Sequence, residues 1–567
     1  MSAVIEVREP SAKYMSALQP PLVRHFELMA TAPGGVKRLR ELILTLAVQG
    51  KLVPQDRKDE PACELLRQIR AEKDRLISTG KIKREKPQTE IAEKAMLLVL
   101  PVGWEWSNLS TIGVINPRND ASDETIASFV QMSSIPVAFS DPHIAEPRSW
   151  RDIKSGFTQF AEGDVGVAKI TPCFENGKST VFQNLSNGIG AGTTELHIVR
   201  PLGGIEPRYV LLFLKTPAFL LGGEAVMTGS AGQKRMPRGY FEYKPFPLPP
   251  LAEQSRIVTR VEELMRLCDA LEAMGQLEAA QHAQLVETLL GALTASAAIE
   301  ELADNWQRVA AHFDLLLDRP EAIDALEQTI LQLAVRGLLV PQDANDEPAS
   351  VLLQRIRTEK DRLMLEGKIK RDKPMALIGP EDVPFEAPKG WVWARFGDAS
   401  INRDGERIPV SASDRENRAK TYDYYGASGV IDKIDGYLFE KTLLLIGEDG
   451  ANLINRSTPI AFLARGKYWV NNHAHVIDTT HPELMTYLEL FINAISLEPY
   501  ITGTAQPKMN QAKLNSIGIA LPPLAEQVRI IACVDSLRRL FADLRKRLAD
   551  RQTTQAHLAE ALIDEVA

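Results

Sequence analysis

Cysteine, net positive charge and long apolar runs are all scarce in this sequence, and each shortage excludes a class of protein. Only four of the 567 residues are cysteines (Cys63, Cys173, Cys268 and Cys533), and no two stand at a paired spacing. That excludes a disulfide framework and a cysteine-based zinc site, and fits a reducing cytosol. The N-terminal stretch lacks the apolar segment of a secretory signal. The most apolar stretch, residues 209–223, is interrupted by Lys215 and Pro217 and is too short to span a bilayer. We therefore expect a cytoplasmic protein without membrane contact.

A basic overall charge is also missing. The formal net charge is −8, whereas simple nucleic-acid binders usually carry a basic footprint. The two regions that differ most between the halves of the chain are not basic either: residues 107–246 hold 13 Lys and Arg against 13 Asp and Glu, and residues 394–520 hold 13 against 15. Composition alone therefore does not indicate a DNA-binding protein.

Catalytic and cofactor motifs are absent as well. "FENGKST" (174–180) ends like a phosphate-binding loop, but Pro172 stands where that loop needs a glycine. "GIGAGT" (188–193) is a lone glycine-rich turn, and no adenine-methyltransferase tetrapeptide occurs. His473 and His475 could begin a metal site, but no cysteine or carboxylate cluster accompanies them in the sequence. We expect no catalytic residue, no metal and no cofactor in this chain.

The dominant feature of the sequence is an internal duplication. Residues 39–87 return as residues 326–374, with 32 identities in 49 positions and no gap. "GW.W" at Gly103 recurs at Gly390, and "LPPLAEQ" (248–254) recurs letter for letter at 521–527. The period is far too long for a solenoid repeat. Each half therefore has the same order of arm, insert and helix, and we see little similarity between the two inserts.

These boundaries divide the chain into six segments. They are an N-terminal helical arm (1–106), a first insert (107–246), a central spacer helix (247–300), a second helical arm (301–393), a second insert (394–520) and a C-terminal spacer helix (521–567).

An apolar stripe of heptad type follows each copy of "LPPLAEQ". The steps between its residues alternate between four and three, which is typical of a coiled-coil seam. Two similar helices of about 40 residues, roughly 60 Å long at 1.5 Å per residue, would most simply pair with each other. The alternative is a helix that lies on a globular core. The seam residues are Ile257, Val261, Leu264, Cys268 and Leu271 in the first helix, and Ile530, Val534, Leu537, Phe541, Leu544 and Leu548 in the second.

The inserts have a different pattern. Short apolar runs such as "DVGVAKI" and "KTLLLIG" alternate with Gly, Asn and Asp turns, which is typical of strands in a mixed domain. We predict an α/β (α+β) fold in which two globular domains are separated by a pair of long, antiparallel coiled-coil helices. Helical arms complete this tandem duplication.

Two dissimilar inserts, each followed by "LPPLAEQ" and a heptad helix, resemble the specificity (S) subunit of type I restriction–modification enzymes. "LAVQGKLVPQD", "GEDGAN" (447–452), "WVNNHAH" (469–475) and "TGTAQPKMNQAKL" (502–514) look like that family too, and the resemblance covers nearly the whole chain from about residue 25. The segment before the first insert, "EKAMLLVLPVGWEW", departs from the family's acidic-proline lead-in, which "EDVPFEAPKGWVW" follows more closely.

The resemblance implies that the inserts are target-recognition domains, each reading half of a split, asymmetric site in double-stranded DNA. It also implies that the paired helices set the spacing and that this subunit does no chemistry. The implied partners are two modification subunits, which bring S-adenosylmethionine and methylate adenine, and restriction subunits, which use ATP and Mg. Two alternatives remain. One is a coiled-coil adaptor that binds two proteins through its inserts, and the other is a fused or standalone enzyme, which would need a cofactor site that the sequence does not reveal.

Candidate DNA-contacting residues are polar groups in the turn-rich stretches of the inserts, where a domain can present them to base edges or phosphates. They are Arg118, Lys169, Lys178, Lys234 and Arg235 in the first insert, and Arg403, Arg407, Arg415, Asn472, His473, Gln506 and Lys508 in the second.

Overall fold

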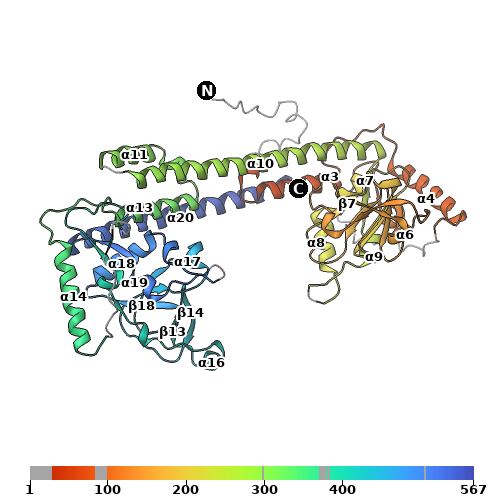
Figure 1. Cartoon of the computed structure of the whole chain (residues 1–567). Helices are drawn as coiled ribbons and strands as arrows, with labels where there is room; N and C mark the ends of the chain where they lie inside the picture. Colours follow the sequence, from red (N-terminus) through yellow and green to blue (C-terminus); the bar gives the residue numbers. More distant parts are fainter. Residues whose placement is uncertain are drawn as a thin grey trace. The chain divides into compact units, whose positions relative to one another are not determined.

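A computed structural model describes residues 29–82, 99–230, 232–296, 299–369, 378–379, 383–503 and 506–566. The chain divides into two compact units, Met1–Glu278 with Arg551–Ala567, and Ala279–Asp550. Each of the two long helices, α10 (Leu251–Ala295) and α20 (Leu524–Val566), therefore contributes to both units (Figure 1). The first 28 residues of the predicted N-terminal arm lie outside the described residues. None of the helices in the described part of the chain has the length and apolarity that crossing a membrane would require.

The first unit contains an arm of two helices and a mixed domain, which is closed by the pairing of its first and last strands. The arm helices are α3 (Gly35–Val48) and α4 (Ala62–Ser78). The strands are β1 (Glu105–Ser107), β2 (Gly113–Ile115), β3 (Ile126–Val130), β4 (Glu146–Ser149), β5 (Thr158–Ala161), β6 (Val165–Ala168), β7 (Ser179–Val181), β8 (Ile189–Gly192), β9 (Leu196–Pro201) and β10 (Phe246–Leu248). The short helices are α5 (Leu109–Ile112), η2 (Met132–Ser134), α6 (Trp150–Ile153), η3 (Ser186–Gly188), α7 (Pro207–Leu214), α8 (Pro217–Ala225) and α9 (Arg238–Tyr243).

The second unit repeats this plan. Its arm helices are α11 (Ile299–Ala311), α12 (Phe313–Leu316), α13 (Pro320–Val335) and α14 (Ala349–Leu365). The strands are β11 (Val392–Arg395), β12 (Ile401–Asn402), β13 (Tyr422–Gly426), β14 (Gly429–Ile434), β15 (Leu443–Gly447), β16 (Ala461–Ala464), β17 (Tyr468–Val470), β18 (Ala474–Asp478) and β19 (Gly518–Leu521). The short helices are α15 (Phe396–Ala399), η5 (Asp404–Glu406), α16 (Ala412–Glu416), α17 (Asn452–Asn455), α18 (Pro482–Ala494), η6 (Glu498–Tyr500) and α19 (Gln511–Asn515).

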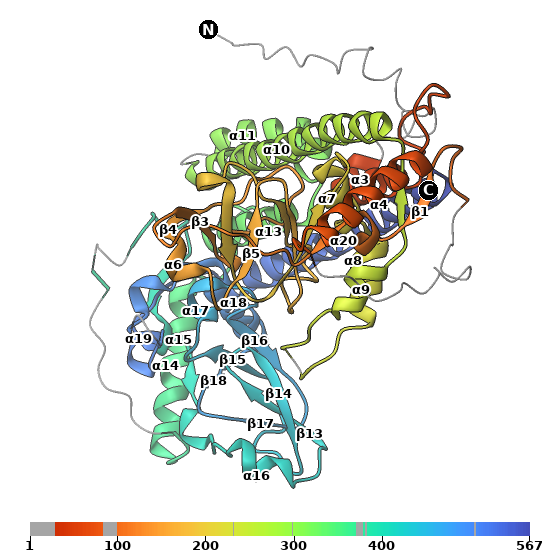
Figure 2. The same cartoon turned by 90° about the vertical axis from the view of Figure 1, so that its right-hand side faces the viewer.

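The central sheets of the two domains have the same topology, although the sequences of the domains show little similarity. The central sheet has the order β2-β9-β6-β7 in one and β12-β18-β15-β16 in the other. The second sheets correspond in part. In the first domain β3 pairs in parallel with β8 in a four-stranded sheet. In the second domain β13 pairs in parallel with β17 in a three-stranded sheet (Figure 2). The pair β1 and β10 closes the first domain as β11 and β19 close the second. The inserts therefore share a backbone frame and differ in the side chains that it carries.

"LPPLAEQ" joins the arm, the domain and the long helix within each unit. Its buried glutamate accepts a hydrogen bond from the arm tryptophan: Trp104 Nε1 donates to Glu253 at 3.0 Å, and Trp391 Nε1 donates to Glu526 at 2.9 Å. The glutamine that follows turns back, so that Gln527 Nε2 donates to the carbonyl of Pro522 at 2.9 Å. Because these contacts are buried and geometrically specific, they explain why both copies keep the glutamate and the glutamine.

The end of each arm helix has the same requirement. Gly50 and Gly337 follow α3 and α13 with φ of 69° and 73°, in the left-handed region that favours glycine. A Cβ at Gly50 would lie 2.5 Å from Pro101 and 3.0 Å from Trp104, and one at Gly337 would meet Pro388 and Trp391 in the same way. These contacts explain why the glycine occurs in both copies of the repeat.

The seam residues divide between two environments. Ile257, Val261, Leu264 and Cys268 are buried in the core of the first unit with α3 and α7, and Leu271 is half-buried. Ile530 and Val534 are buried in the core of the second domain. Leu537, Phe541, Leu544 and Leu548 belong instead to a helical cluster with Val286 and Leu290 of α10 and with α13. The N-terminal part of each long helix therefore lies on a globular core. The sequence pattern did not distinguish this from helix pairing, because an apolar stripe with a 3.5-residue period can face either a core or a partner helix.

Candidate nucleic-acid interface

One polar site recurs in both domains, at the ends of the two inner strands of the central sheet. We call it the strand-end site. It is formed by the residues after the central strand (Lys169 and Ile170 after β6; Glu448 and Asp449 after β15) and by the residues before the neighbouring strand (Glu195 before β9; Asn472 and His473 before β18). The described residues of a return segment complete it (228–230 and 232–236; 502–503 and 506–509).

Backbone hydrogen bonds establish that the two sites are equivalent. In the first domain, the Lys169 N–H donates to the Glu195 carbonyl at 2.9 Å, and the Met236 N–H donates to the Lys169 carbonyl at 2.7 Å. In the second, the Glu448 N–H donates to the His473 carbonyl at 2.8 Å, and the Met509 N–H donates to the Glu448 carbonyl at 2.8 Å.

The return segments are a further duplicated element, which the ungapped comparison of the two halves missed. They read "TGSAGQKRM" and "TGTAQPKM", so a single-residue length difference hides the similarity. In each, the threonine and the last cation form an isolated bridge, Thr228 with Arg235 and Thr502 with Lys508. The glycine after each threonine, Gly229 or Gly503, has no room for a side chain. A Cβ on either one would lie 2.7 Å from a carbonyl oxygen of the same segment, which requires glycine there. An alignment that allowed one gap would have revealed this element.

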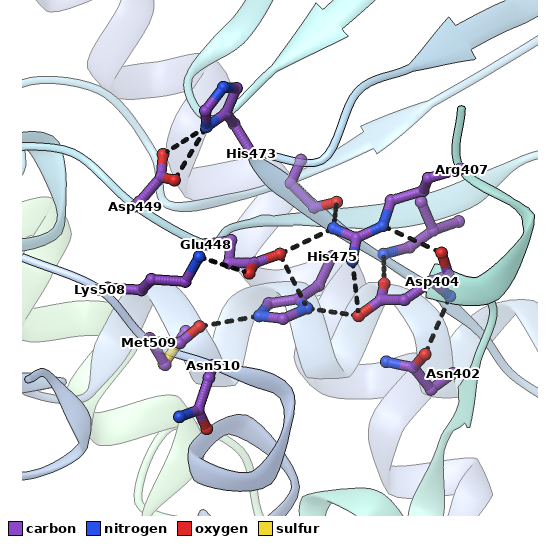
Figure 3. A network of polar contacts seen from close by, with 12 residues as sticks. Asn402, Asp404, Arg407, Glu448, Asp449, His473, His475, Lys508, Met509 and Asn510 are labelled. Carbon is purple, nitrogen blue, oxygen red and sulfur yellow. Dashed lines mark hydrogen bonds and ion pairs between the residues drawn. The ribbon is translucent and has the colours of Figure 1, made fainter. Parts of the chain in front are cut away.

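In the second domain a buried network lies beneath the strand-end site (Figure 3). His475 Nδ1 lies 2.6 Å from Asp404 Oδ2, and its Nε2 lies 2.8 Å from the Met509 carbonyl. Arg407 donates to Glu448 at 2.8 Å and to the Ala474 carbonyl at 2.7 Å. These contacts tie the return segment and the loop after β12 to the two central strands.

Paired charges keep the acids of this network ionised. Burial acts to raise the pKa of Asp404, but the hydrogen bond from His475 and the nearby Arg407 outweigh it, so the pKa is lowered. Burial likewise opposes ionisation of Glu448, and the hydrogen bond from Arg407, with His475 and Lys508 nearby, lowers its pKa.

The same network bears on metal binding. Among the described residues, Asp404, Glu448 and His475 bring three possible ligand atoms within 4.8 Å of one another. However, Arg407 and Lys508 already pair with the carboxylates, and both ring nitrogens of His475 have partners. His473, in contrast, is half-exposed and bonds Asp449. This donor set fits a structural network and not a metal centre.

The first domain has the equivalent histidine in an apolar setting. His197 lies 3.3 Å from the Met236 carbonyl through Nε2 and stacks on Phe241 at 5.3 Å. Its buried Nδ1 has no hydrogen-bond partner among the described residues. Burial lowers the pKa of His197 to about 4, so this histidine is neutral where its counterpart bonds a carboxylate.

The structure brings some predicted residues of the first domain together. Lys169, Lys234 and Arg235 lie at the strand-end site, where Arg235 forms a bidentate ion pair with Glu195 at 2.9 and 3.0 Å. Arg118 is exposed in the loop after β2. Lys178 instead donates to the Met132 carbonyl at 2.8 Å.

In the second domain the predicted residues form two groups. Asn472, His473, Gln506 and Lys508 are exposed and lie at the strand-end site. The three arginines instead form ion pairs with acidic residues of the same domain and are less exposed. Arg403 bonds Glu406 and lies 3.3 Å from Asp478, Arg407 is 13% exposed, and Arg415 is 12% exposed, bonded to Asp432 at 2.8 Å and stacked over Tyr424. The turn-rich sequence around them gave no signal of these partners.

Comparison with known proteins connects this geometry to a family. Residues 388–551 match the family model described as type I restriction modification DNA specificity domain. The chain is 44% identical over 554 residues to the type I restriction enzyme EcoAI specificity subunit of Escherichia coli, covering 94% of this chain and 93% of that protein. It is 43% identical over 555 residues, with the same coverage, to the EcoEI specificity subunit of Escherichia coli.

A solved structure supports the fold. A chain from a study of complex assembly and conformational transition of the type I R-M system shares 16% identity at a TM-score of 0.50, and the similarity covers 82% of this chain and 98% of that one. On the sequence identity over nearly its whole length, this chain belongs to the family of type I restriction enzyme specificity subunits.

Proposed function

We propose that this chain gives a type I restriction–modification complex its DNA specificity by reading a bipartite, asymmetric target, with one half-site for each domain. The observation that carries the proposal is the pair of strand-end sites. One backbone frame occurs twice, yet equivalent positions carry Lys169 and Glu448, or Glu195 and His473. An asymmetric target requires such an arrangement, because hydrogen-bonding groups on base edges are read by complementary side chains.

The balance of charge indicates that DNA binding is shared with partner subunits. Phosphate contacts dominate affinity for DNA, yet neither domain is basic overall, and the arginines at 403, 407 and 415 are paired with acids of their own domain. We expect two modification subunits to supply most phosphate contacts and to flip and methylate an adenine in each half-site. On this proposal, S-adenosylmethionine, Mg and ATP belong to the modification and restriction subunits, and this chain contributes no catalytic group.

An exposed apolar residue on α20 is consistent with protein partners. Ile531 and Leu540 are both apolar residues of α20 outside the seam. Leu540 is 58% exposed, whereas Ile531 packs against the core of the second domain. Co-expression with the modification subunit should yield a complex that contains two copies of it. A stable monomer that ignores that subunit would contradict this part of the proposal.

Exchange of one domain tests the assignment of half-sites. Residues 107–246 would be replaced by the corresponding segment of a related specificity subunit, with the β1–β10 closure kept as the junction. Sequencing of methyladenine in a host that expresses the complex should show one half of the motif changed, with the other half and the gap preserved. A change in both halves would contradict the proposal.

Insertion of four residues into each long helix tests their role as a spacer, because both α10 and α20 contribute to both units. The exposed stretches 272–281 of α10 and 549–554 of α20 accept the insertions without disturbing a core. Each insertion adds roughly 6 Å of helix, against about 3.4 Å per base pair, so the gap should widen by one or two base pairs or binding should be lost. Altered bases with an unchanged gap would refute the spacer role.

The alternative function, an adaptor that binds two proteins, predicts a different result. A complex with the modification subunits would then produce no DNA mobility shift and no methylated motif.

A further inference from the structure

The two strand-end sites differ in a way that separates two kinds of DNA contact. Every DNA half-site presents the same phosphate backbone and its own bases. Residues of the same charge at equivalent positions are therefore suited to the backbone, and residues that differ are suited to the bases. In the return segments the equivalent positions are Arg235 and Lys508, which are both cations. Before the neighbouring strands they are Glu195 and His473, which are unlike.

We propose, on the basis of the function proposed above, that Glu195 and His473 contact bases at equivalent positions of the two half-sites, and that Arg235 and Lys508 contact phosphate. Both cations are presented at the surface. Their side chains are 45% and 50% exposed, and each is held by one acid, Arg235 by Glu195 at 2.9 Å and Lys508 by Glu448 at 3.1 Å. Each acid fixes the position of its cation and leaves part of the cation open to an anion.

Glu195 is suited to accept hydrogen bonds. The hydrogen bond from Arg235 lowers its pKa, so the side chain stays a carboxylate and offers only acceptor atoms. On a base edge in the major groove, the complementary group is an amino donor such as N4 of cytosine. Arg235 therefore has a second role, which is to orient this carboxylate.

His473 is oriented by a different partner. Its Nδ1 lies 2.8 Å from Asp449 Oδ2, so Nδ1–H donates to the carboxylate. No hydrogen-bond partner of Nε2 occurs among the described residues, and the side chain is 50% exposed. The Asp449 contact holds the ring with Nε2 outward, where it can bond a base edge that differs from the one Glu195 reads.

Volume-preserving substitutions test the two roles in the complex with the modification subunits. Glu195→Gln and His473→Gln should each relax one position of one half-site, with about a ten- to hundredfold loss of discrimination there and no change in the other half. The measurement is the methylated motif in genomic DNA, together with binding to duplexes that carry single base changes. A normal melting temperature would show that each variant is folded.

Lys508→Gln should weaken binding to all duplexes alike and reduce the slope of log affinity against log salt by about one. Lys467→Gln is the matched control. Lys467 lies in the same domain and forms an ion pair with Glu440 (3.2 Å), and neither residue belongs to the strand-end site. Arg235→Gln should act like Lys508→Gln, with added relaxation in the half-site of Glu195.

The outcomes separate this inference from the proposed function. A wild-type complex that methylates no split motif would refute the proposed function. A split motif that stays unchanged in the Glu195→Gln and His473→Gln variants would overturn the assignment of Glu195 and His473. Relaxation of both half-sites by either variant would overturn it as well. Equal salt slopes for the Lys508→Gln and Lys467→Gln variants would overturn the phosphate contact.

Discussion

Trp391 and Glu526 are joined by a buried hydrogen bond in which the indole Nε1 donates to a carboxylate oxygen at 2.9 Å. They are 135 residues apart in the sequence, and the bond connects the end of the arm to the first turn of α20. The same bond joins Trp104 to Glu253 in the other unit. Each unit thus contains an identical joint between the repeated segments.

Loss of this joint should destabilise the second unit. Glu526→Ala leaves a buried indole N–H without an acceptor, which should cost about 1–3 kcal/mol of unfolding free energy. The Glu526→Gln variant keeps an acceptor oxygen and should lose less. Denaturant unfolding followed by tryptophan fluorescence measures both variants. Equal losses would show that the hydrogen bond is not what stabilises the joint.

Breaking the buried network of the second domain should cost more than breaking a surface pair. Arg407→Ala removes the more buried of the two cations that pair with Glu448, and Lys508 remains as the other. Because the Glu448 side chain is only 11% exposed, a loss of about 3 kcal/mol is expected. Arg418→Ala breaks a pair with Asp435 in which both side chains are at least 33% exposed, so the loss should be much smaller than for Arg407→Ala. Comparable losses in thermal or denaturant unfolding would contradict the inward role of Arg407.

The stability of the first unit should fall on acidification because of His197. Its pKa is about 4 in the folded chain, below the ordinary value of 6.5. Between these values the unfolded chain binds the proton and the folded chain does not, so stability is lost as the pH falls from about 6.5 to about 4. A His197→Gln variant should lose less stability than the wild type across this range when melting temperatures are measured at several pH values. An unchanged pH dependence would assign the effect to other groups.

Metal removal should leave the second domain unaffected. Arg407 and Lys508 already neutralise the acids near His475, so a divalent cation would have to displace both. We expect the melting temperature to be the same after dialysis against EDTA and after addition of zinc or magnesium. A stabilisation that saturates with one equivalent of metal, and that Glu448→Gln abolishes, would show that the cluster binds an ion.

The sequence by itself determined the duplicated plan and the family. The repeats around Gly50 and Gly337, and the two copies of "LPPLAEQ", are local patterns with strict steric or hydrogen-bonding needs. The two halves therefore keep the same residues there, and a comparison of the halves reveals them. Helix periodicity located α10 and α20 for the same reason, since a helix is specified by residues close in sequence.

Only the tertiary structure decided which polar residues face outward. Arg407 and Arg415 stand in turn-rich sequence like Asn472 and Gln506, yet their acidic partners Glu448 and Asp432 come from other segments. The shared topology of the two inserts was hidden as well, because the strand order of a sheet depends on pairing between distant segments, and apolar residues of many kinds fill the same core. Charge pairing and strand pairing are both non-local, and a reading along the chain gives neither.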